Sequence, residues 1–153
     1  MSLDARRLRC APCGLDARLG REMSRHRLER ALEKACRIGN ASVAQIFASA
    51  VRSRIAEDPE GGGPLRFHLH RLLYETVEGR GHTWIVEMLL SAGANPNQRR
   101  TPNITTLLHD ASARGLDDVM KALIDAGADV KARDFYGHGY ADVYNAMGGS
   151  TII

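Results

Sequence analysis

Two cysteines and a histidine near the start of the chain have the spacing of a metal site. Cys10 and Cys13 are separated by two residues, and His26 follows after twelve more, as in the front half of a zinc finger. Tetrahedral zinc needs a fourth ligand or a bound water, and residues 30–32, where the ligand would stand, offer none. Cys36 would complete the site only with unusual geometry. We therefore predict no metal, and three cysteines, which cannot all pair within the chain, indicate reduced thiols.

The other histidines are the next place to look for catalysis. His68 and His70 are two residues apart, so on a helix they point in different directions. An acid-base centre could combine one of them with Glu75, Asp110, Tyr136 and His138 around a groove. No nucleophile elbow, phosphate-binding loop or dinucleotide fingerprint accompanies these residues. We predict no catalytic residue and no cofactor, and we keep a small-molecule enzyme or ligand binder using this groove as the alternative function.

The elements that would position these side chains are repeated helices. Segment 81–97 is followed 34 residues later by a near copy, segment 115–131. Counted from an aligned glycine, apolar residues recur at the fourth and eighth positions and alanine at the eleventh, which marks one helix face. The residues are Val43, Phe47 and Ala50 in the first unit, Ile85, Leu89 and Ala92 in the second, and Val119, Leu123 and Ala126 in the third. Such units are too small to bury their own apolar faces, so they must stack.

Glycine and proline mark where these helices end. Gly93 and Gly127 follow the second helices of two units, where a positive φ is expected and glycine adopts it freely. Segment 56–64 contains two prolines and three glycines, so we predict a flexible inserted loop there. Residues Arg66 to Glu78 would then form an unusually long first helix of the second unit.

Particular residues in these units resemble those of a known family. Thr106-Leu-Leu-His-Asp-Ala-Ser-Ala-Arg-Gly115 resembles the T-P-L-H-x-A-x-x-x-G signature of ankyrin repeats, and segments 92–97 and 126–131 resemble the A-G-A-[DN]-x-N ending. The resemblance covers residues 81–148 well and residues 27–54 in part. It implies an all-α, ankyrin-type helix-turn-helix repeat solenoid of about three and a half repeats, the first degenerate. It also implies that His109 links a hairpin to a helix.

The bulk composition sets the remaining expectations. We expect a basic tail over residues 1–24 and an ankyrin repeat domain over 25–153 that carries the 56–64 insertion. Residues 1–37 have ten basic and five acidic side chains, but we interpret this as a solvated terminus, so nucleic acid is not an expected partner. The chain shows no apolar run long enough for a membrane span and no secretory signal, which predicts a cytoplasmic or nuclear protein without membrane contact.

The resemblance implies that the chain binds another protein, through hairpin tips and the concave face of the first helices, and self-association through an exposed end is compatible with so few repeats. Arginine and tyrosine dominate interface energetics, which makes their positions the candidate contacts. The candidates at the tips are Gln98, Arg99, Arg100, Lys131, Arg133, Phe135, Tyr136 and His138, and those in the groove are Arg80, Asp110 and Arg114.

Overall fold

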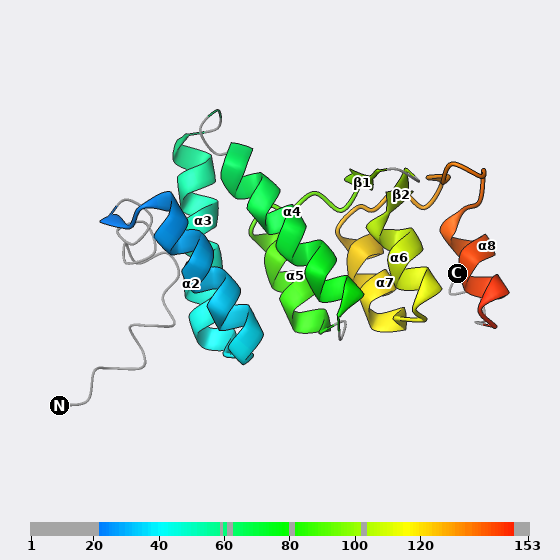
Figure 1. The fold of residues 1–153 in the computed structure, drawn as a ribbon, viewed down its shortest axis with the longest axis horizontal. Coiled ribbons are helices and arrows are strands. Elements are labelled where there is room, and N and C mark those ends of the chain that lie inside the picture. Colours follow the sequence, from blue (N-terminus) through cyan, green and yellow to red (C-terminus); the bar gives the residue numbers. More distant parts are fainter. Residues whose placement is uncertain (1–21, 59, 61–62, 80–81, 102–103, 149–153) are drawn as a thin grey trace. The chain divides into compact units, whose positions relative to one another are not determined.

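The computed structural model describes residues 22–58, 60, 63–79, 82–101 and 104–148, and the chain separates into two compact units, residues 1–66 and 67–153. Within the described residues the chain forms helices and one short hairpin, which confirms the all-α, ankyrin-type prediction (Figure 1). The elements are α2 (Arg25–Ile38), α3 (Ala41–Glu57), α4 (Gly63–Glu78), α5 (Thr83–Ser91), β1 (Arg99–Arg100), β2 (Thr105–Thr106), α6 (Leu107–Ala113), α7 (Asp117–Asp125) and α8 (Tyr140–Ala146). None of these helices combines the length and apolar character that a membrane crossing demands.

The first unit is the helix pair α2 and α3, which pack against each other. Helix α2 ends at Gly39, whose φ of 77° gives the left-handed cap that glycine adopts without strain. The side chain of Asn40 then accepts a hydrogen bond from the Val43 N–H at 3.1 Å and caps the start of α3. A glycine followed by asparagine therefore fixes the turn of this pair.

The predicted apolar face of α3 is confirmed only in part, at Ala50. Val43 is exposed and Phe47 is half-buried, whereas the buried positions are Ala44, Ala48, Ala50, Val51 and Ile55. Alanine gives weak hydrophobic contrast in a sequence but allows two helix backbones to approach closely. The buried positions of α3 therefore combine small residues with Val51 and Ile55.

The loop that we predict over residues 56–64 is shorter in the structure, at both ends. Helix α3 continues through Glu57, and α4 begins at Gly63 with Pro64 in its first turn. Proline is compatible with a first helical turn because the N–H that it lacks would have no partner within the helix there. Helix α4 is 16 residues long, so the first helix of this repeat is indeed long and begins before Arg66.

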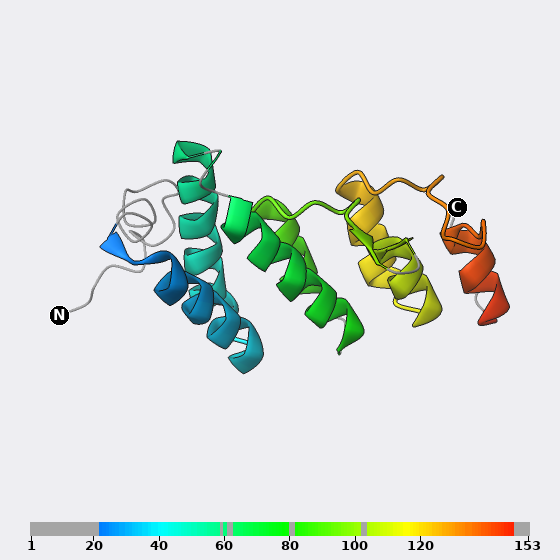
Figure 2. The same cartoon turned by 45° about the horizontal axis from the view of Figure 1, so that its top comes forward.

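The second unit contains two rows of helices. Helix α6 packs on α7 and on α8, and α5 packs on α7, so first helices form one row and second helices the other (Figures 1 and 2). Ile85, Leu89, Val119 and Leu123 are all buried, which confirms the predicted apolar face in both of these repeats. Ala92, the residue that caps α5, is buried, whereas Ala126 at the matching position after α7 is exposed, so the predicted alanine is buried in one of these two repeats.

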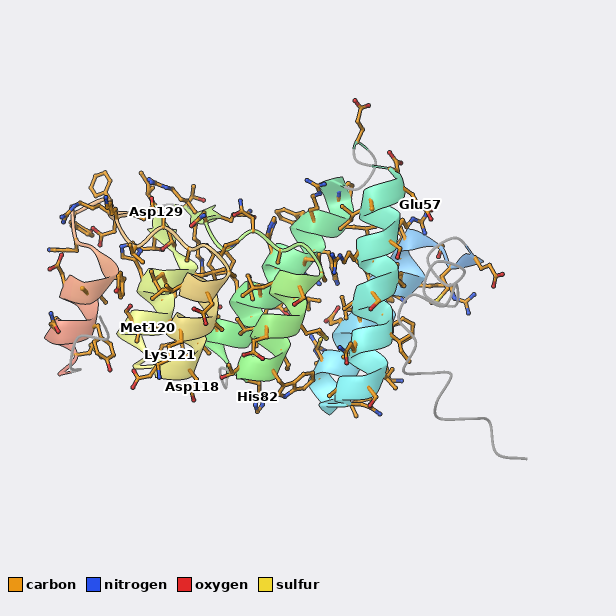
Figure 3. The ribbon with its side chains drawn as sticks, turned by 180° about the vertical axis from the view of Figure 1, so that it is seen from behind. Glu57, His82, Asp118, Met120, Lys121 and Asp129 are labelled. Carbon is orange, nitrogen blue, oxygen red and sulfur yellow. The ribbon has the colours of Figure 1, made fainter. Side chains whose placement is uncertain are left out.

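The turns of the second unit lie at its two ends. Asp129 lies at the end that carries the hairpins, and His82 and Asp118 lie at the opposite end (Figure 3). Gly93 and Gly127 have φ values of 107° and 90°, which confirms the predicted left-handed turns.

One asparagine ties two successive hairpins together. The side chain of Asn97 donates to the Gly127 carbonyl at 3.0 Å and accepts from the Asp129 N–H at 2.6 Å. The two hairpins are therefore held side by side, and residues 34 apart in the sequence occupy matching positions on neighbouring tips. Arg99 and Arg133 are such a pair.

Helix α8 is the last helix among the described residues, and it packs on α6. Its anchor is Tyr144, which is buried and whose hydroxyl donates to the Asp117 carboxylate at 2.7 Å. This hydrogen bond raises the pKa of Tyr144, and burial adds to it. The first helix of the last repeat is thus fixed to the start of α7.

Candidate protein-binding surface

The His109 side chain supports the turn before α8 through hydrogen bonds. The ring is buried, with 3% of the residue exposed. Its Nδ1 accepts from the Thr106 N–H at 3.3 Å and lies 2.8 Å from the Thr106 hydroxyl, which leaves the proton on Nε2. That Nε2 donates to the His138 carbonyl at 3.1 Å. The predicted structural role is confirmed, and the ring holds the turn before α8 against the start of α6.

A second side chain, Asp134, organises that turn. Its Oδ1 accepts the backbone N–H groups of Tyr136 at 2.9 Å and His138 at 2.8 Å, and its own N–H donates to the His138 carbonyl at 2.9 Å. Gly137, with a φ of 81°, completes the tight turn. Asp134 is not among the predicted binding residues, but an aspartate that opens an Asp-x-x-Gly segment is a sequence signal for such a turn.

These hydrogen bonds predict an acid-sensitive turn. Desolvation raises the pKa of Asp134, but the N–H groups of His138 and Tyr136 lower it more, so the net pKa is below the ordinary value. A carboxyl with a lowered folded pKa stabilises the fold above its unfolded pKa of about 3.9, and that stabilisation is lost as the pH falls through the folded pKa. We expect Asp134→Ala to lower the melting temperature at neutral pH and the difference from the unchanged protein to shrink below about pH 4. Thermal melts from neutral to strongly acidic pH measure this, and a difference independent of pH would contradict it.

The turn presents two aromatic side chains to solvent. Phe135 and Tyr136 are each 69% exposed, and their rings contact each other edge to face with centroids 5.5 Å apart. The His138 ring lies 6.2 Å from the Tyr136 ring. Phe135 is therefore not packed into the neighbouring hairpin. We call Phe135 and Tyr136 the aromatic tip.

Three basic residues lie on the same turn as the aromatic tip or on the preceding hairpin. Arg133 donates to the Gly137 carbonyl at 2.7 Å and lies 3.8 Å from Asp142, yet 66% of its side chain is exposed. Lys131 is exposed, and its N–H donates to Asp129 Oδ1 at 2.9 Å. Arg99 is exposed on the preceding hairpin. Gln98 is only half-buried, but its carbonyl accepts from Tyr74.

Arg100 is exposed as well, but it contacts α4. Its guanidinium forms an ion pair with Glu78 and lies 5.8 Å from the centre of the Tyr74 ring, both on α4. The Tyr74 hydroxyl donates to the Gln98 carbonyl at 2.9 Å. Arg100 thus joins the hairpin to α4 while about half of its side chain stays exposed, at 51%. Sequence reasoning missed Tyr74 and Glu78, because α4 lacks the family signature that would have marked its positions.

The groove candidates on α6 lie near this ion pair. Asp110 is half-buried, and its Oδ2 is buried without a hydrogen-bond partner among the described residues. Burial raises the pKa of Asp110, while Arg100, His109 and Arg114 lower it in part. Burial and the nearby Asp110 carboxylate raise the pKa of Tyr74 to about 12. Arg114 is exposed at the end of α6, and Arg80 lies outside the described residues.

The histidines that an enzyme would use have different partners. His70 Nε2 accepts from the Asn95 N–H at 2.6 Å, so this ring supports its own hairpin much as His109 does. His68 Nδ1 lies 3.4 Å from an Arg71 nitrogen. The His138 ring lies 3.6 Å from Asp134. Across the part of the chain that the structure describes, no three His, Cys, Asp or Glu side chains gather as metal ligands would.

Of the three cysteines considered as metal ligands, the structure describes Cys36. Cys10 and Cys13 lie outside the described residues. Burial, with a contribution from Glu33, raises the pKa of Cys36 to about 11. The reactive thiolate is therefore scarce at neutral pH. We expect iodoacetamide to label Cys36 at least about tenfold more slowly in the folded protein than in urea. Peptide mass spectrometry follows this cysteine separately, and equal rates would show that burial does not protect it.

The comparisons with known proteins agree with this geometry. The family model of the ankyrin repeat matches residues 104–135, which span β2, α6, α7 and the turn up to Phe135. The chain also resembles the potassium channel GORK of Arabidopsis thaliana, with 34% identity over 82 residues that make up 51% of this chain and 9% of the channel. The chain therefore matches only a small part of that relative's length. Residues 104–135 thus match an ankyrin repeat, and the helix pairs α6–α7 and α5–α7 pack together as in that fold.

Proposed function

We propose that the protein is an adaptor or scaffold module that binds another protein through the tips of its hairpins and the adjoining first helices. Ankyrin repeats are in general protein-interaction modules, and the finer choice of surface rests on the side chains described above. The observation that carries the proposal is the aromatic tip: two large rings, both more than two-thirds exposed, on one rigid turn.

The energetic reason is that such rings are costly to leave in water. Aromatic side chains bury about 150–250 Å² each, and tyrosine and arginine are enriched among the residues that dominate binding energy. The turn is already ordered by Asp134, by Gly137 and by the buried His109. A partner therefore gains aromatic burial without an entropic cost for ordering the loop.

The groove residues extend this surface. The Arg100–Glu78 pair and the Tyr74 hydroxyl fix the preceding hairpin to α4, and Asp110 and Arg114 stand on the next first helix. We infer that a partner lying across both hairpins also contacts the exposed polar side chains of α6. These contacts would supply orientation, since exposed charge pairs contribute little affinity individually.

A site-specific cross-link tests the surface. A photoreactive phenylalanine analogue at position 136 is expected to capture a protein from native lysate, and the same analogue at Lys121 on α7 is the control (Figure 3). Capture from position 136 but not from 121 supports the proposal, because the two positions lie on different elements of one unit. Equal capture, or none at position 136, would refute it.

A further inference from the structure

The guanidinium group of Arg100 lies near carboxylates on two helices, Glu78 on α4 and Asp110 on α6. It forms an ion pair with Glu78, and its central carbon lies 5.8 Å from the centre of the Tyr74 ring. Burial raises the pKa of Asp110, and the charge of Arg100 opposes this rise. Burial also raises the pKa of Tyr74 to about 12, with the charge of Asp110 adding to the rise and that of Arg100 opposing it. Tyr74, Arg100 and Asp110 are therefore mutually close.

The two carboxylates are satisfied unequally. The Glu78 carboxylate accepts a hydrogen bond from Arg100. The Asp110 Oδ2 atom is buried and has no hydrogen-bond partner among the described residues. A buried carboxylate oxygen without a donor is unfavourable, because it loses its hydration and gains no hydrogen bond in return. A donor that reached this oxygen would therefore stabilise the fold.

The other charged groups that act on Asp110 do not supply this donor. The neighbouring His109 uses both ring nitrogens in the contacts described above. Arg114 is exposed at the end of α6 and forms no hydrogen bond with Asp110 Oδ2. Among the described cations whose charge acts on the pKa of Asp110, which burial raises, Arg100 is left as the donor.

We infer that Arg100 exchanges between two positions, one paired with Glu78 and one in which it donates to Asp110 Oδ2. The backbone of Arg100 pairs with Thr105, directly before the N-cap of α6, so its side chain starts close to the helix that carries Asp110. That side chain is 51% exposed, so packing does not hold it at Glu78. The hairpin is joined to α4 in the first position and to α6 in the second. Any cation that neutralises Glu78 would favour the second position, because the attraction of Arg100 to α4 then disappears.

An NMR titration of the full chain, labelled with ¹³C at the Asp and Glu carboxyl groups, measures this exchange. The variant Glu78→Gln mimics a neutralised Glu78, so Arg100 should move to Asp110 and shift the midpoint of the Asp110 titration to lower pH, since a hydrogen bond to the charged form favours that form. The matched control is Glu75→Gln. It removes a carboxylate of the same helix that lies 3.8 Å from Arg71, and it should leave the Asp110 midpoint unchanged.

The same titration in an Arg100→Gln background separates the exchange from a direct effect of the Glu78 charge. If Arg100 exchanges, Glu78→Gln shifts the Asp110 midpoint when Arg100 is present and leaves it in place when Arg100 is absent. No shift in either background, or an equal shift in both, would overturn the inference. The replaced side chains are each at least 39% exposed, so the variants should fold, and circular dichroism checks this. The result does not depend on whether the tips bind a protein.

Discussion

Replacement of His109 by alanine is expected to lower the free energy of unfolding of the second unit by about 2–4 kcal/mol. The ring is buried, so alanine leaves a cavity, and the Thr106 N–H loses its acceptor. The contact to the His138 carbonyl is lost at the same time, and with it the link between α6 and the turn before α8. Because both packing and hydrogen bonds are lost, the decrease in the free energy of unfolding should exceed that caused by replacing an exposed side chain.

Urea unfolding followed by tryptophan fluorescence measures this change. The chain contains one tryptophan, Trp84, which is half-buried on α5 and therefore reports on the second unit. His82→Ala is the matched control, because that side chain is exposed at the start of α5 and its loss should cost no more than about 0.5 kcal/mol. An equal effect of the two replacements would show that the His109 hydrogen bonds do not stabilise the fold.

His109 also shows which parts of the fold are predictable from sequence. Its role follows from neighbours a few residues away, Thr106 among them, so a local motif contains the information. The same holds for Gly93 and Gly127, where the backbone conformation itself selects the residue. Local constraints of this kind leave a clear signal in one sequence.

Features that depend on tertiary packing leave a weaker signal. On α3 the buried positions include Ala44 and Ala48, which a search for large apolar residues passes over, whereas Val43 of the predicted pattern is exposed. Arg100 sits among apparent tip residues in the sequence, but its position depends on Glu78 and Tyr74 of another element. Neither partner could be found from spacing alone, because α4 lacks the family motif.

Whether Phe135 is exposed also depends on tertiary structure. Composition favours a buried phenylalanine, and the sequence alone left burial and exposure open. In the structure the Asp134 carboxylate accepts hydrogen bonds from the Tyr136 and His138 N–H groups and so closes the turn. The Phe135 ring on this turn is exposed. Two exposed aromatic rings carry an unfavourable free energy of hydration, and a binding partner that covers them would remove it.

The joint replacement of Phe135 and Tyr136 by alanine is accordingly expected to weaken binding of the cross-linked partner by about 100-fold or more, since central aromatic contacts contribute about 2 kcal/mol or more. Both rings are exposed in the free protein, so the free energy of unfolding should change by no more than about 0.5 kcal/mol. Calorimetric titration of the purified partner measures the affinity, and His138→Ala serves as the comparison. In a binding module His138→Ala should change affinity by less than about threefold, because that ring lies at the margin of the pair. The reverse ranking, with His138 dominant and the aromatic pair dispensable, would instead favour a groove that acts on a small molecule.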